Sequence, residues 1–520
     1  MALIHVMDLT FRYDGSYENI FEHTSFQIDS DWRLGFIGRN GKGKTTFLKL
    51  LMGEYECSGT ISTNLEFEYF PYPVKRQDAL TLEVLSEICP SAEDWELIRE
   101  LSLLNVDAEI LYRPYETLSS GEKTKAMITA MFLKENAFLL IDEPTNHLDM
   151  EGRELLGSYL KKKKGFILVS HDRAFLDSCI DHVLSVNRAD IEIQKGNFST
   201  WWENRQRKDQ FELAEHTKLK KDIGRLQDAA RRAGGWAAKV EKTKKGTRIA
   251  GLRPDRGAIG HKSAKMMKRA KSLEKRRQGE IEEKSKLLKN LEESEEIRLD
   301  GLTFHTDKLV DLKDVTVRYG SHSVCENVTF TICRGEHVVL HGKNGSGKSS
   351  ILKLICGGGG SLGLPEEKEP EAEMAKAPAS EGRRCDVLSY LGSIERHDKL
   401  KISYVCQDIA GLAGNLSDYA ETYAIEESLF KAFLRKLGFS REQFDKRIED
   451  YSDGQKKKVM LARSLCERAH LYVWDEPLNY VDVISRIQIE EMLSGSDAAM
   501  VFVEHDRRFC ERVATKSVFL

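Results

Sequence analysis

The stretch GRNGKGKTT at Gly38–Thr46 recurs as GKNGSGKSS at Gly342–Ser350, and this repeated pattern is the strongest indication of the fold in the sequence. Each follows a short apolar run and precedes an apolar pattern with helical spacing, so each GxxxxGKS/T sequence joins a strand to a helix. Glycines in such a loop let successive backbone N–H groups face nucleotide phosphates, and the helix N-terminus adds a favourable dipole. The two stretches predict two nucleotide-binding α/β domains.

Within each loop, residue type indicates a role toward ATP and Mg²⁺. Lys44 and Lys348 supply positive charge to the phosphates, and Thr45 and Ser349 offer hydroxyl oxygens to Mg²⁺. The other loop residues expected to bind ATP are Gly38, Asn40, Gly41, Gly43 and Thr46, and Gly342, Asn344, Gly345, Gly347 and Ser350. The alternative is a glycine-rich turn without a ligand, which the motifs that follow each loop disfavour.

Three further motifs repeat in the same order, so the chain carries one domain twice. The interval from Ser119 to Asp142 is 23 residues, and so is the interval from Ser452 to Asp475. The repeated pairs are LSSGEK (Leu118–Lys123) with YSDGQK (Tyr451–Lys456), FLLIDEPTNHLD (Phe138–Asp149) with LYVWDEPLNYVD (Leu471–Asp482), and LVSHDRAF (Leu168–Phe175) with FVEHDRRF (Phe502–Phe509).

The repeated acidic and histidine residues are candidates for hydrolysis chemistry. The aspartate of each DEP motif ends an apolar run that we expect to be a buried parallel strand, where a carboxylate can hold Mg²⁺ through water. The next glutamate can act as general base, and a histidine after the following strand can orient water. A lone histidine is usually structural, but these recur in register with the carboxylates. The residues are Asp142, Glu143 and His171, and Asp475, Glu476 and His505.

Composition predicts an ordinary globular protein of several domains. The chain has 520 residues, 41% of them apolar and 31% charged, with ten scattered cysteines and no CxxC pair. No apolar run reaches the roughly 18 residues that span a bilayer, and Met1–Asp8 lacks the character of a signal peptide. We expect a cytoplasmic protein without a membrane segment.

A strongly basic segment separates the two halves. Residues Lys218–Arg277 contain 21 Lys and Arg against 5 Asp and Glu, a net charge of +16 in a chain whose total is −4. The surrounding residues 204–298 have helical patterns on both sides of Gly246–Gly260, which predicts a two-helix hairpin about 60 Å long. A solvated coiled coil and an acidic protein partner remain alternatives, but backbone contact with structured RNA fits the charge best.

These motifs resemble those of ABC ATPases, in which LSGGQ is the signature. The resemblance implies that each signature lies across from the other half's phosphate loop, so one chain forms both ATP sites without a second subunit. The signature residues implied to bind ATP are Ser119, Gly121 and Glu122, and Ser452, Gly454 and Gln455. Tyr13 and Tyr319 are similar in position to the family's adenine-stacking aromatics, with a buried core tyrosine as the alternative.

Two residues depart from the family pattern. Tyr72 stands where a Q-loop glutamine is expected, whereas the second half has Gln407 there, which the resemblance implies as a Mg²⁺ ligand. Asp453 replaces a signature glycine and places a carboxylate close to bound phosphate. We therefore expect the two ATP sites to differ.

Two such domains, a basic two-helix linker and no membrane domain resemble the ABC-F family. Several stretches are similar to its Lsa/Vga type of antibiotic-resistance protein: Trp32–Thr46, Glu100–Asp107, Gly196–Ser199, Gly257–Lys271 and Trp474–Asp482. The domains expected are 1–203 and 299–520, each an ABC-type nucleotide-binding domain, with the helical-hairpin linker 204–298 between them. Residues 357–384 are expected to be a disordered insertion.

The resemblance implies a mechanism on the ribosome. With ATP bound, the protein would enter the E site, and the linker tip at about 244–261 would pass the P-site tRNA toward the peptidyl-transferase centre. It would there dislodge lincosamides, pleuromutilins or streptogramin A. The residues implied to contact large-subunit rRNA or tRNA are Lys244, Lys245, Arg248, Ile249, Leu252, Arg253, His261, Lys262, Lys265, Lys268 and Arg269.

Three rival functions stay open from the sequence. An ABC-F translation factor without a resistance role would share the ATPase and the ribosome. The ATPase subunit of an exporter would keep a Q-loop glutamine, which Tyr72 disfavours although Gln407 remains. A DNA-repair ABC ATPase would carry a longer coiled coil inside one domain, whereas both domains here are uninterrupted.

Overall fold

A computed structural model describes most of the two repeated halves of the chain. The residues described are 2–13, 19–146, 148–187, 190–212, 214, 217, 218, 221, 299, 301–319, 322–357, 388–409 and 411–520. The chain divides into two compact units, Met1–Ser199 with Glu296–Leu520, and Thr200–Glu295. Both repeated halves lie in the first unit, and we call residues 2–199 cassette 1 and residues 299–520 cassette 2.

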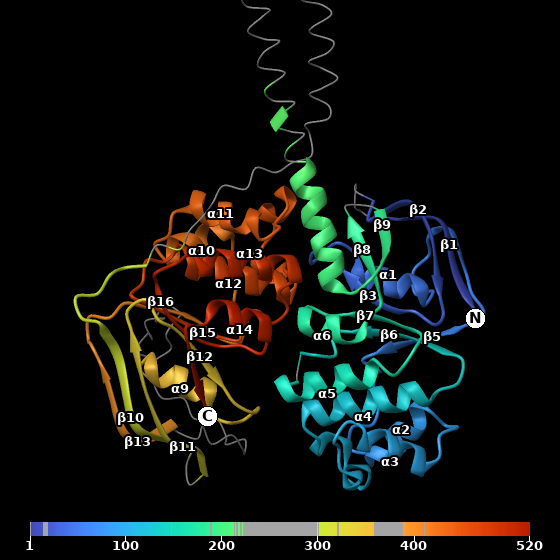
Figure 1. Cartoon of the computed structure of the whole chain (residues 1–520), viewed down its shortest axis with the longest axis horizontal. Coiled ribbons are helices and arrows are strands. Elements are labelled where there is room, and N and C mark those ends of the chain that lie inside the picture. Colours follow the sequence, from blue (N-terminus) through green and yellow to red (C-terminus); the bar gives the residue numbers. More distant parts are fainter. Residues whose placement is uncertain are drawn as a thin grey trace, which may run out of the picture. The chain divides into compact units, whose positions relative to one another are not determined.

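Cassette 1 is built on a six-stranded sheet with the order β5-β6-β7-β3-β8-β9 (Figure 1). All neighbouring strands are parallel except β8 and β9, which form an antiparallel pair. The strands are β3 (Arg33–Ile37), β5 (Glu66–Phe70), β6 (Ala137–Asp142), β7 (Phe166–Val169), β8 (His182–Asn187) and β9 (Asp190–Lys195). The central strands are almost wholly buried apolar residues, as expected for a parallel sheet covered on both faces.

Cassette 2 repeats this sheet with five parallel strands in the order β14-β15-β16-β12-β17. The strands are β12 (His337–His341), β14 (Ile402–Val405), β15 (Leu471–Asp475), β16 (Ala499–Val503) and β17 (Lys516–Phe519). The order matches β5-β6-β7-β3-β8 strand for strand, so the repeated motifs occupy equivalent places. The buried parallel strands predicted before Asp142 and Asp475 are confirmed as β6 and β15.

Each cassette adds a three-stranded antiparallel sheet, and a helix packs into the core beside it. In cassette 1 the order is β2-β1-β4, and in cassette 2 it is β11-β10-β13. Phe47 of the helix α1 (Lys44–Leu51) is fully buried among residues of both sheets. The strands are β1 (Leu3–Phe11), β2 (Phe21–Asp29), β4 (Ser58–Ser62), β10 (Lys308–Tyr319), β11 (His322–Cys333) and β13 (Leu388–Arg396), and the helix of cassette 2 is α9 (Lys348–Ile355).

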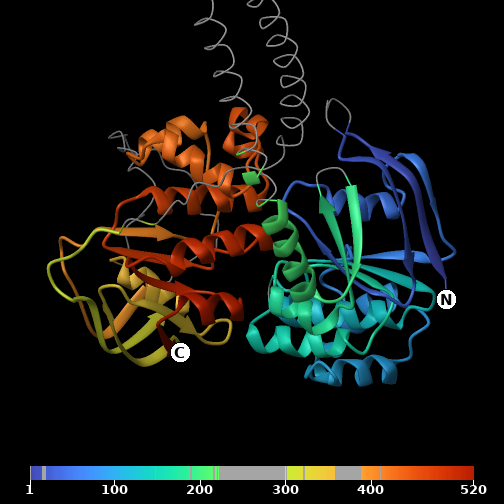
Figure 2. The same cartoon turned by 45° about the horizontal axis from the view of Figure 1, so that its top comes forward.

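The remaining helices place the other motifs. In cassette 1, α2–α4 gather together away from β1 and β2, as Figures 1 and 2 both show. The helices of cassette 1 are α2 (Thr81–Ile88), α3 (Asp94–Ser102), α4 (Ser120–Leu133), α5 (Met150–Leu160) and α6 (Arg173–Cys179). Those of cassette 2 are α10 (Leu416–Thr422), α11 (Glu427–Lys436), α12 (Asp453–Cys466), α13 (Val483–Ser494) and α14 (Arg507–Val513).

Several predictions fall outside the described residues. They concern the hairpin tip at about 244–261, every residue named above as an RNA contact, and the insertion 357–384 apart from Gly357. The bounds of the three expected domains also stay predictions. Within the described ranges, no helix is both long and apolar enough to cross a bilayer.

Candidate functional site

The predicted phosphate loops lie between a central strand and a buried helix in each cassette. In cassette 1 the loop runs from the end of β3 to the start of α1, and Gly43 caps that helix with φ 87°. A Cβ on Gly43 would lie 2.4 Å from Cγ2 of Ile20, so both the backbone angle and the close packing require glycine. Gly347 caps α9 in the same way with φ 88°. The loops therefore expose a helix N-terminus where anionic phosphate binds favourably.

In cassette 1, the loop lysine and threonine contact other residues of the predicted site. The Lys44 Nζ donates to the carbonyl of Gly38 at 2.7 Å, and burial lowers the pKa of Lys44. The Thr45 Oγ1 donates to Asp142 Oδ2 at 3.1 Å, so a hydroxyl and a carboxylate lie side by side. The Tyr13 hydroxyl lies 2.8 Å from Thr46 Oγ1. The structure thus brings together six residues that are up to 129 positions apart in the chain.

Cassette 2 builds the same arrangement. The Lys348 Nζ donates to the carbonyl of Gly342 at 2.9 Å, and burial lowers its pKa. The Ser349 Oγ donates to Asp475 Oδ1 at 3.0 Å, and the Tyr319 hydroxyl lies 2.9 Å from a second serine oxygen of α9. Tyr13 is 41% exposed and Tyr319 partly exposed, so neither is the buried core tyrosine that was the alternative.

The paired oxygens suit a hard cation. Mg²⁺ takes oxygen ligands and is usually held by one or two protein groups together with substrate phosphates and water. Each cassette offers this set: Thr45 with Asp142, and Ser349 with Asp475. Burial raises the pKa of both aspartates in these sites, which marks carboxylates placed in a poorly solvated position. The residues present therefore fit Mg²⁺.

The two glutamates share a strained backbone. Glu143 has φ 50° and Glu476 has φ 46°, in the left-handed region that residues with a Cβ rarely adopt. Backbone hydrogen bonds to the neighbouring strand hold them there, from N of Glu143 to O of Val169 at 2.9 Å and from N of Glu476 to O of Val503 at 3.1 Å. Strain of this kind concentrates at functional sites because the surrounding structure has to enforce it.

The side-chain surroundings of Glu476 are polar. Its Oε2 accepts hydrogen bonds from Gln407 Nε2 at 2.8 Å and from Asn479 Nδ2 at 2.5 Å, and His505 Nε2 lies 3.7 Å from Oε1. Burial alone would raise the pKa of Glu476, but His505, Asn479 and Gln407 outweigh it and lower the pKa. The carboxylate is thus stabilised in its ionised form.

Glu143 is held differently. Nε2 of His171 lies 3.2 Å from Oε1 of Glu143, but neither carboxylate oxygen has a hydrogen bond of good geometry. Burial, followed by the charge of Asp142, raises the pKa of Glu143. Burial together with Lys44 also lowers the pKa of His171 well below its ordinary value. The two glutamates therefore differ in both contacts and charge preference.

The difference between the surroundings of Glu143 and Glu476 follows from the residue at position 72. Strand register shows which residue of cassette 2 is equivalent to Tyr72. Phe70 pairs with the residue before Asp142, and Val405 pairs with the residue before Asp475. Position 72 in cassette 1 is therefore equivalent to Gln407 in cassette 2. The backbone N–H of Tyr72 donates to Met127 Sδ at 3.1 Å, and no side-chain hydrogen bond joins Tyr72 to Glu143 among the described residues.

Sequence reasoning missed Tyr69. Its hydroxyl donates to Asp142 Oδ2 at 2.9 Å, beside the Thr45 hydroxyl on the same oxygen. Burial and the charge of Asp142 raise the pKa of Tyr69, so it remains a neutral donor. An alternation of polar and aromatic residues in Glu66–Phe70 was visible, but it does not reveal that position 69 faces Asp142.

The signature residues start helices that face the opposite cassette. Ser119 and Glu122 form a capping box at the N-terminus of α4, and Ser452 and Gln455 form one at α12. A Cβ on Gly454 would lie 2.4 Å from Asn40 Nδ2, so this signature lies directly against the phosphate loop of cassette 1. The predicted pairing of each signature with the other half's loop is thus present in the geometry for cassette 1.

Further contacts cross between the cassettes at this place. The Asn40 Nδ2 donates to the carbonyl of Tyr480 at 2.6 Å, and the Asn40 N–H donates to Asp482 Oδ2 at 3.3 Å. Asp482 also pairs with Lys458 Nζ at 2.5 Å in a fully buried position. Sequence reasoning named Asn40 but missed Asp482 and Lys458, because nothing in their spacing indicates the contact.

The second pairing lines a cavity of about 780 Å³. Its walls combine the signature of cassette 1 with the phosphate loop, glutamine, glutamate and histidine of cassette 2. The predicted site residues that line it are Ser119, Gly121, Glu122, Tyr319, Asn344, Gly345, Gly347, Lys348, Ser349, Ser350, Gln407, Glu476 and His505. The volume and polar lining are those of a nucleotide-sized site.

Comparisons with known proteins agree with this geometry. The family model described as "ABC transporter" matches residues 21–146 and 325–479. The chain is 27% identical over 516 residues to the ribosome protection protein VmlR of Bacillus subtilis, covering 98% of this chain and 85% of that protein. It is 23% identical over 550 residues to the energy-dependent translational throttle protein EttA of Haemophilus influenzae, covering 96% and 88%.

A solved structure shares the fold. The archaeal ribosome recycling factor aABCE1, solved with ribosomal stalk protein aP1, matches with a TM-score of 0.57 at 18% identity. The match covers 98% of this chain and 87% of that one. The family match covers both phosphate loops, both signatures and both DEP motifs. The similarity to VmlR and EttA supports a place among the ABC-F proteins, and the chain belongs to the ABC transporter family as an ATPase with tandem ATP-binding domains.

Proposed function

We propose that the protein is a ribosome protection ATPase that binds the ribosome with ATP bound and dislodges antibiotics from the large subunit. The observation that carries the proposal is its similarity to the ribosome protection protein VmlR along 98% of the chain. The basic segment Lys218–Arg277, with a net charge of +16, supplies a surface for ribosomal RNA and P-site tRNA. The drug classes proposed are lincosamides, pleuromutilins and streptogramin A, as for the Lsa/Vga type.

The residues of each cassette have defined roles in this proposal. Lys44 and Lys348 hold the phosphates of ATP through their charge, and the signature helices of the opposite cassette complete each site. Mg²⁺ neutralises phosphate charge when bound, held by Thr45 with Asp142 and by the equivalent serine and aspartate of cassette 2.

Glu143 and Glu476 act as general bases that take a proton from the attacking water. His171 and His505 lie against these glutamates and orient that water. Both cassettes are on one chain, so ATP closes them without a second subunit. Hydrolysis then opens the cassettes and allows release from the ribosome.

The test uses the variant Glu143→Gln with Glu476→Gln. It should bind ATP, hydrolyse it far more slowly than the native protein, and cosediment with ribosomes in the presence of ATP. The native protein with ATP, and the variant without ATP, are the controls. A double variant that sediments free of ribosomes with ATP present would overturn the ribosomal role.

A translation factor without a drug role is the second candidate, favoured by the 23% identity to EttA over 96% of the chain. Expression in a drug-sensitive host separates the two. Growth in lincomycin, tiamulin and virginiamycin M should rise with the native protein and not with the double glutamate variant. If the native protein binds ribosomes but changes no drug response, the translation factor is the better assignment.

A further inference from the structure

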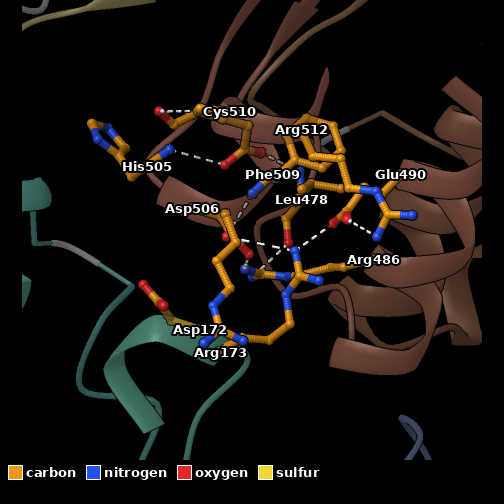
Figure 3. Close-up of polar contacts among 12 residues, drawn as sticks. Asp172, Arg173, Leu478, Arg486, Glu490, His505, Asp506, Phe509, Cys510 and Arg512 are labelled. Atoms are coloured by element: carbon orange, nitrogen blue, oxygen red, sulfur yellow. Dashed lines mark hydrogen bonds and ion pairs between the residues drawn. The ribbon is translucent and has the colours of Figure 1, made fainter. Parts of the chain in front are cut away.

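A buried arginine joins the two active loops of cassette 2. Arg486 of α13 donates from Nη2 to the carbonyl of Leu478 at 2.9 Å and from Nη1 to Asp506 Oδ2 at 3.4 Å (Figure 3). Leu478 lies two residues after Glu476, and Asp506 directly follows His505. One guanidinium therefore links the loop that carries the glutamate with the loop that carries the histidine.

Cassette 1 has the equivalent link. Arg153 of α5 donates from Nε to the carbonyl of Leu148 at 3.0 Å and from Nη1 to Asp172 Oδ2 at 3.0 Å. Asp172 directly follows His171 and caps α6 through a hydrogen bond from the N–H of Phe175. Each cassette thus contains a buried arginine that joins its two loops by hydrogen bonds.

Arg173 directly follows Asp172 in the chain and contacts cassette 2, so it connects the loops joined by Arg153 to those joined by Arg486. Its Nη2 pairs with the carboxylate of Glu490 and lies 3.8 Å from Asp506 Oδ1, both in cassette 2. Figure 3 shows the side chain of Arg173 extending toward Asp506 and Glu490. The side chains of Arg173, Glu490 and Asp506 are 7%, 2% and 0% exposed. Among the described residues, Arg173 forms ion pairs with cassette 2 alone.

Among the residues that the structure describes, no fully buried ion pair runs from cassette 2 to cassette 1, although Arg508 pairs with Asp177 at 2.5 Å with side chains 39% and 13% exposed. Arg507 is the equivalent of Arg173, but it pairs with Glu154 at 3.2 Å where both side chains are about 60% exposed. Glu490 is eight residues after Asp482, and the residue eight after Asp149 is Gly157. A Cβ on Gly157 would lie 2.4 Å from Ser178 Oγ, so no acidic side chain fits there. Salt and water screen an exposed pair far more than a buried one.

We propose that Arg173 is a positioning residue that couples ATP turnover at the two sites. Any shift of the His171 loop moves Asp172 and Arg173, and the buried pairs pass that shift to Asp506 beside His505. Chains of packed, hydrogen-bonded groups carry energetic coupling between sites, and that coupling is reciprocal. The ion pairs of Arg173 with Glu490 and Asp506 form such a chain between the His171 loop of cassette 1 and the His505 loop of cassette 2. This inference rests on the general-base roles proposed for the two glutamates.

The test measures whether the two sites act independently. In the native background, the kcat of Glu143→Gln is added to the kcat of Glu476→Gln. This sum should differ from the kcat of the native protein by about twofold or more, because the effects of coupled residues are not additive. When Arg173→Gln is also present, the kcat values of the same two glutamate variants should add up to the kcat of the Arg173→Gln protein. Glu490→Gln should restore additivity in the same way, and Arg173→Lys, which keeps the charge, should retain part of the coupling.

Arg507→Gln is the matched control, because it removes the equivalent exposed pair and should leave the non-additivity unchanged. A purely structural role would lower the melting temperature of Arg173→Gln without changing additivity. Additive rates in the native background, or equal non-additivity with and without Arg173, would overturn the proposal.

A second measurement does not depend on the glutamate roles. If Glu143→Gln with Glu476→Gln still hydrolyses ATP, those roles are wrong, and coupling is then judged from the dependence of rate on ATP concentration. The Hill coefficient should fall toward 1 in Arg173→Gln and stay at its native value in Arg507→Gln. An unchanged Hill coefficient in Arg173→Gln would also refute the coupling.

Discussion

Gln407 donates a hydrogen bond to Glu476 at 2.8 Å, whereas the equivalent position of cassette 1 holds Tyr72, which makes no such contact with Glu143. The two glutamates share a backbone conformation but not a side-chain environment. The two ATP sites therefore differ in the loop that follows the edge strand of each sheet, β5 in cassette 1 and β14 in cassette 2. It predicts that the two sites respond differently to equivalent substitutions.

Gln407→Leu should slow the site that contains Glu476. A hydrogen bond to a charged group contributes about 1.5–3 kcal/mol, so kcat should fall by about tenfold or more. The measurement is steady-state ATPase in a Glu143→Gln background, where only this site turns over. Tyr72→Phe in a Glu476→Gln background is the matched control, and we expect a change below about twofold. Equal effects of the two substitutions would contradict the asymmetry.

Lys458→Met should destabilise cassette 2. Lys458 pairs with Asp482 at 2.5 Å, and the two side chains are 3% and 0% exposed. Removing one partner of a buried ion pair costs about 3–5 kcal/mol, because the other charge stays buried and unpaired. Differential scanning calorimetry of the full chain should show a lower transition temperature.

The control for that variant is Lys125→Met, the equivalent lysine of cassette 1. The Lys125 Nζ donates to the carbonyl of Leu104 at 3.1 Å and has no ion pair among the described residues. We expect a loss of about 1 kcal/mol, the value of one ordinary hydrogen bond. If Lys458→Met and Lys125→Met lower the stability of the protein equally, the buried ion pair with Asp482 is not what stabilises cassette 2.

The stability of cassette 1 should depend on pH through Glu100. Its Oε2 accepts hydrogen bonds from Tyr159 at 2.8 Å and Lys163 at 2.6 Å. Burial alone would raise the pKa of Glu100, but Lys163 and Tyr159 outweigh it and lower the pKa. A lowered pKa in the folded state stabilises the protein above the unfolded pKa of about 4.3, and this contribution is lost as pH falls through the folded pKa.

Glu100→Gln is the variant that tests this. Its urea midpoint should lie below that of the native protein at pH 7, and the difference should shrink as pH falls below about 4. Glu109→Gln, on the exposed surface of the same cassette, is the control and should leave the pH profile unchanged. A native–variant difference that stays constant from pH 7 to pH 3 would exclude this role.

Ribosome association should weaken as salt rises. The 21 basic residues of Lys218–Arg277 would release counterions from RNA phosphates, so log K should fall linearly with log salt concentration. The double variant Lys244→Glu with Lys245→Glu should show a shallower dependence of log K on log salt concentration. The measurement is ribosome cosedimentation at about 50 to 300 mM KCl, with the ATP concentration held constant. Lys161→Glu with Lys162→Glu, which lie on cassette 1, is the charge-matched control. An association insensitive to salt would argue that the basic segment is not the contact.

Sequence motifs alone predicted the fold class, which the structure confirms, and a set of candidate residues for both ATP sites. The glycines and lysine of a phosphate loop, the signature, and the aspartate–glutamate pair act through local backbone geometry, so short motifs carry them. Their repetition in the same order, with 23 residues from signature serine to aspartate in each half, predicted two similar domains, and the matching strand orders agree. The departure at Tyr72 was also visible, because it lies within a recognisable strand-and-loop context.

How these residues are held and joined depends on tertiary packing, which the motifs do not reveal. The Tyr69 hydroxyl reaches Asp142 because two parallel strands place their ends together, which spacing does not reveal. Arg173 pairs with Glu490 across 317 residues, and that contact depends on how helices of the two cassettes pack. A charged residue on a short helix is usually exposed, so its burial against a carboxylate follows from packing and not from sequence pattern.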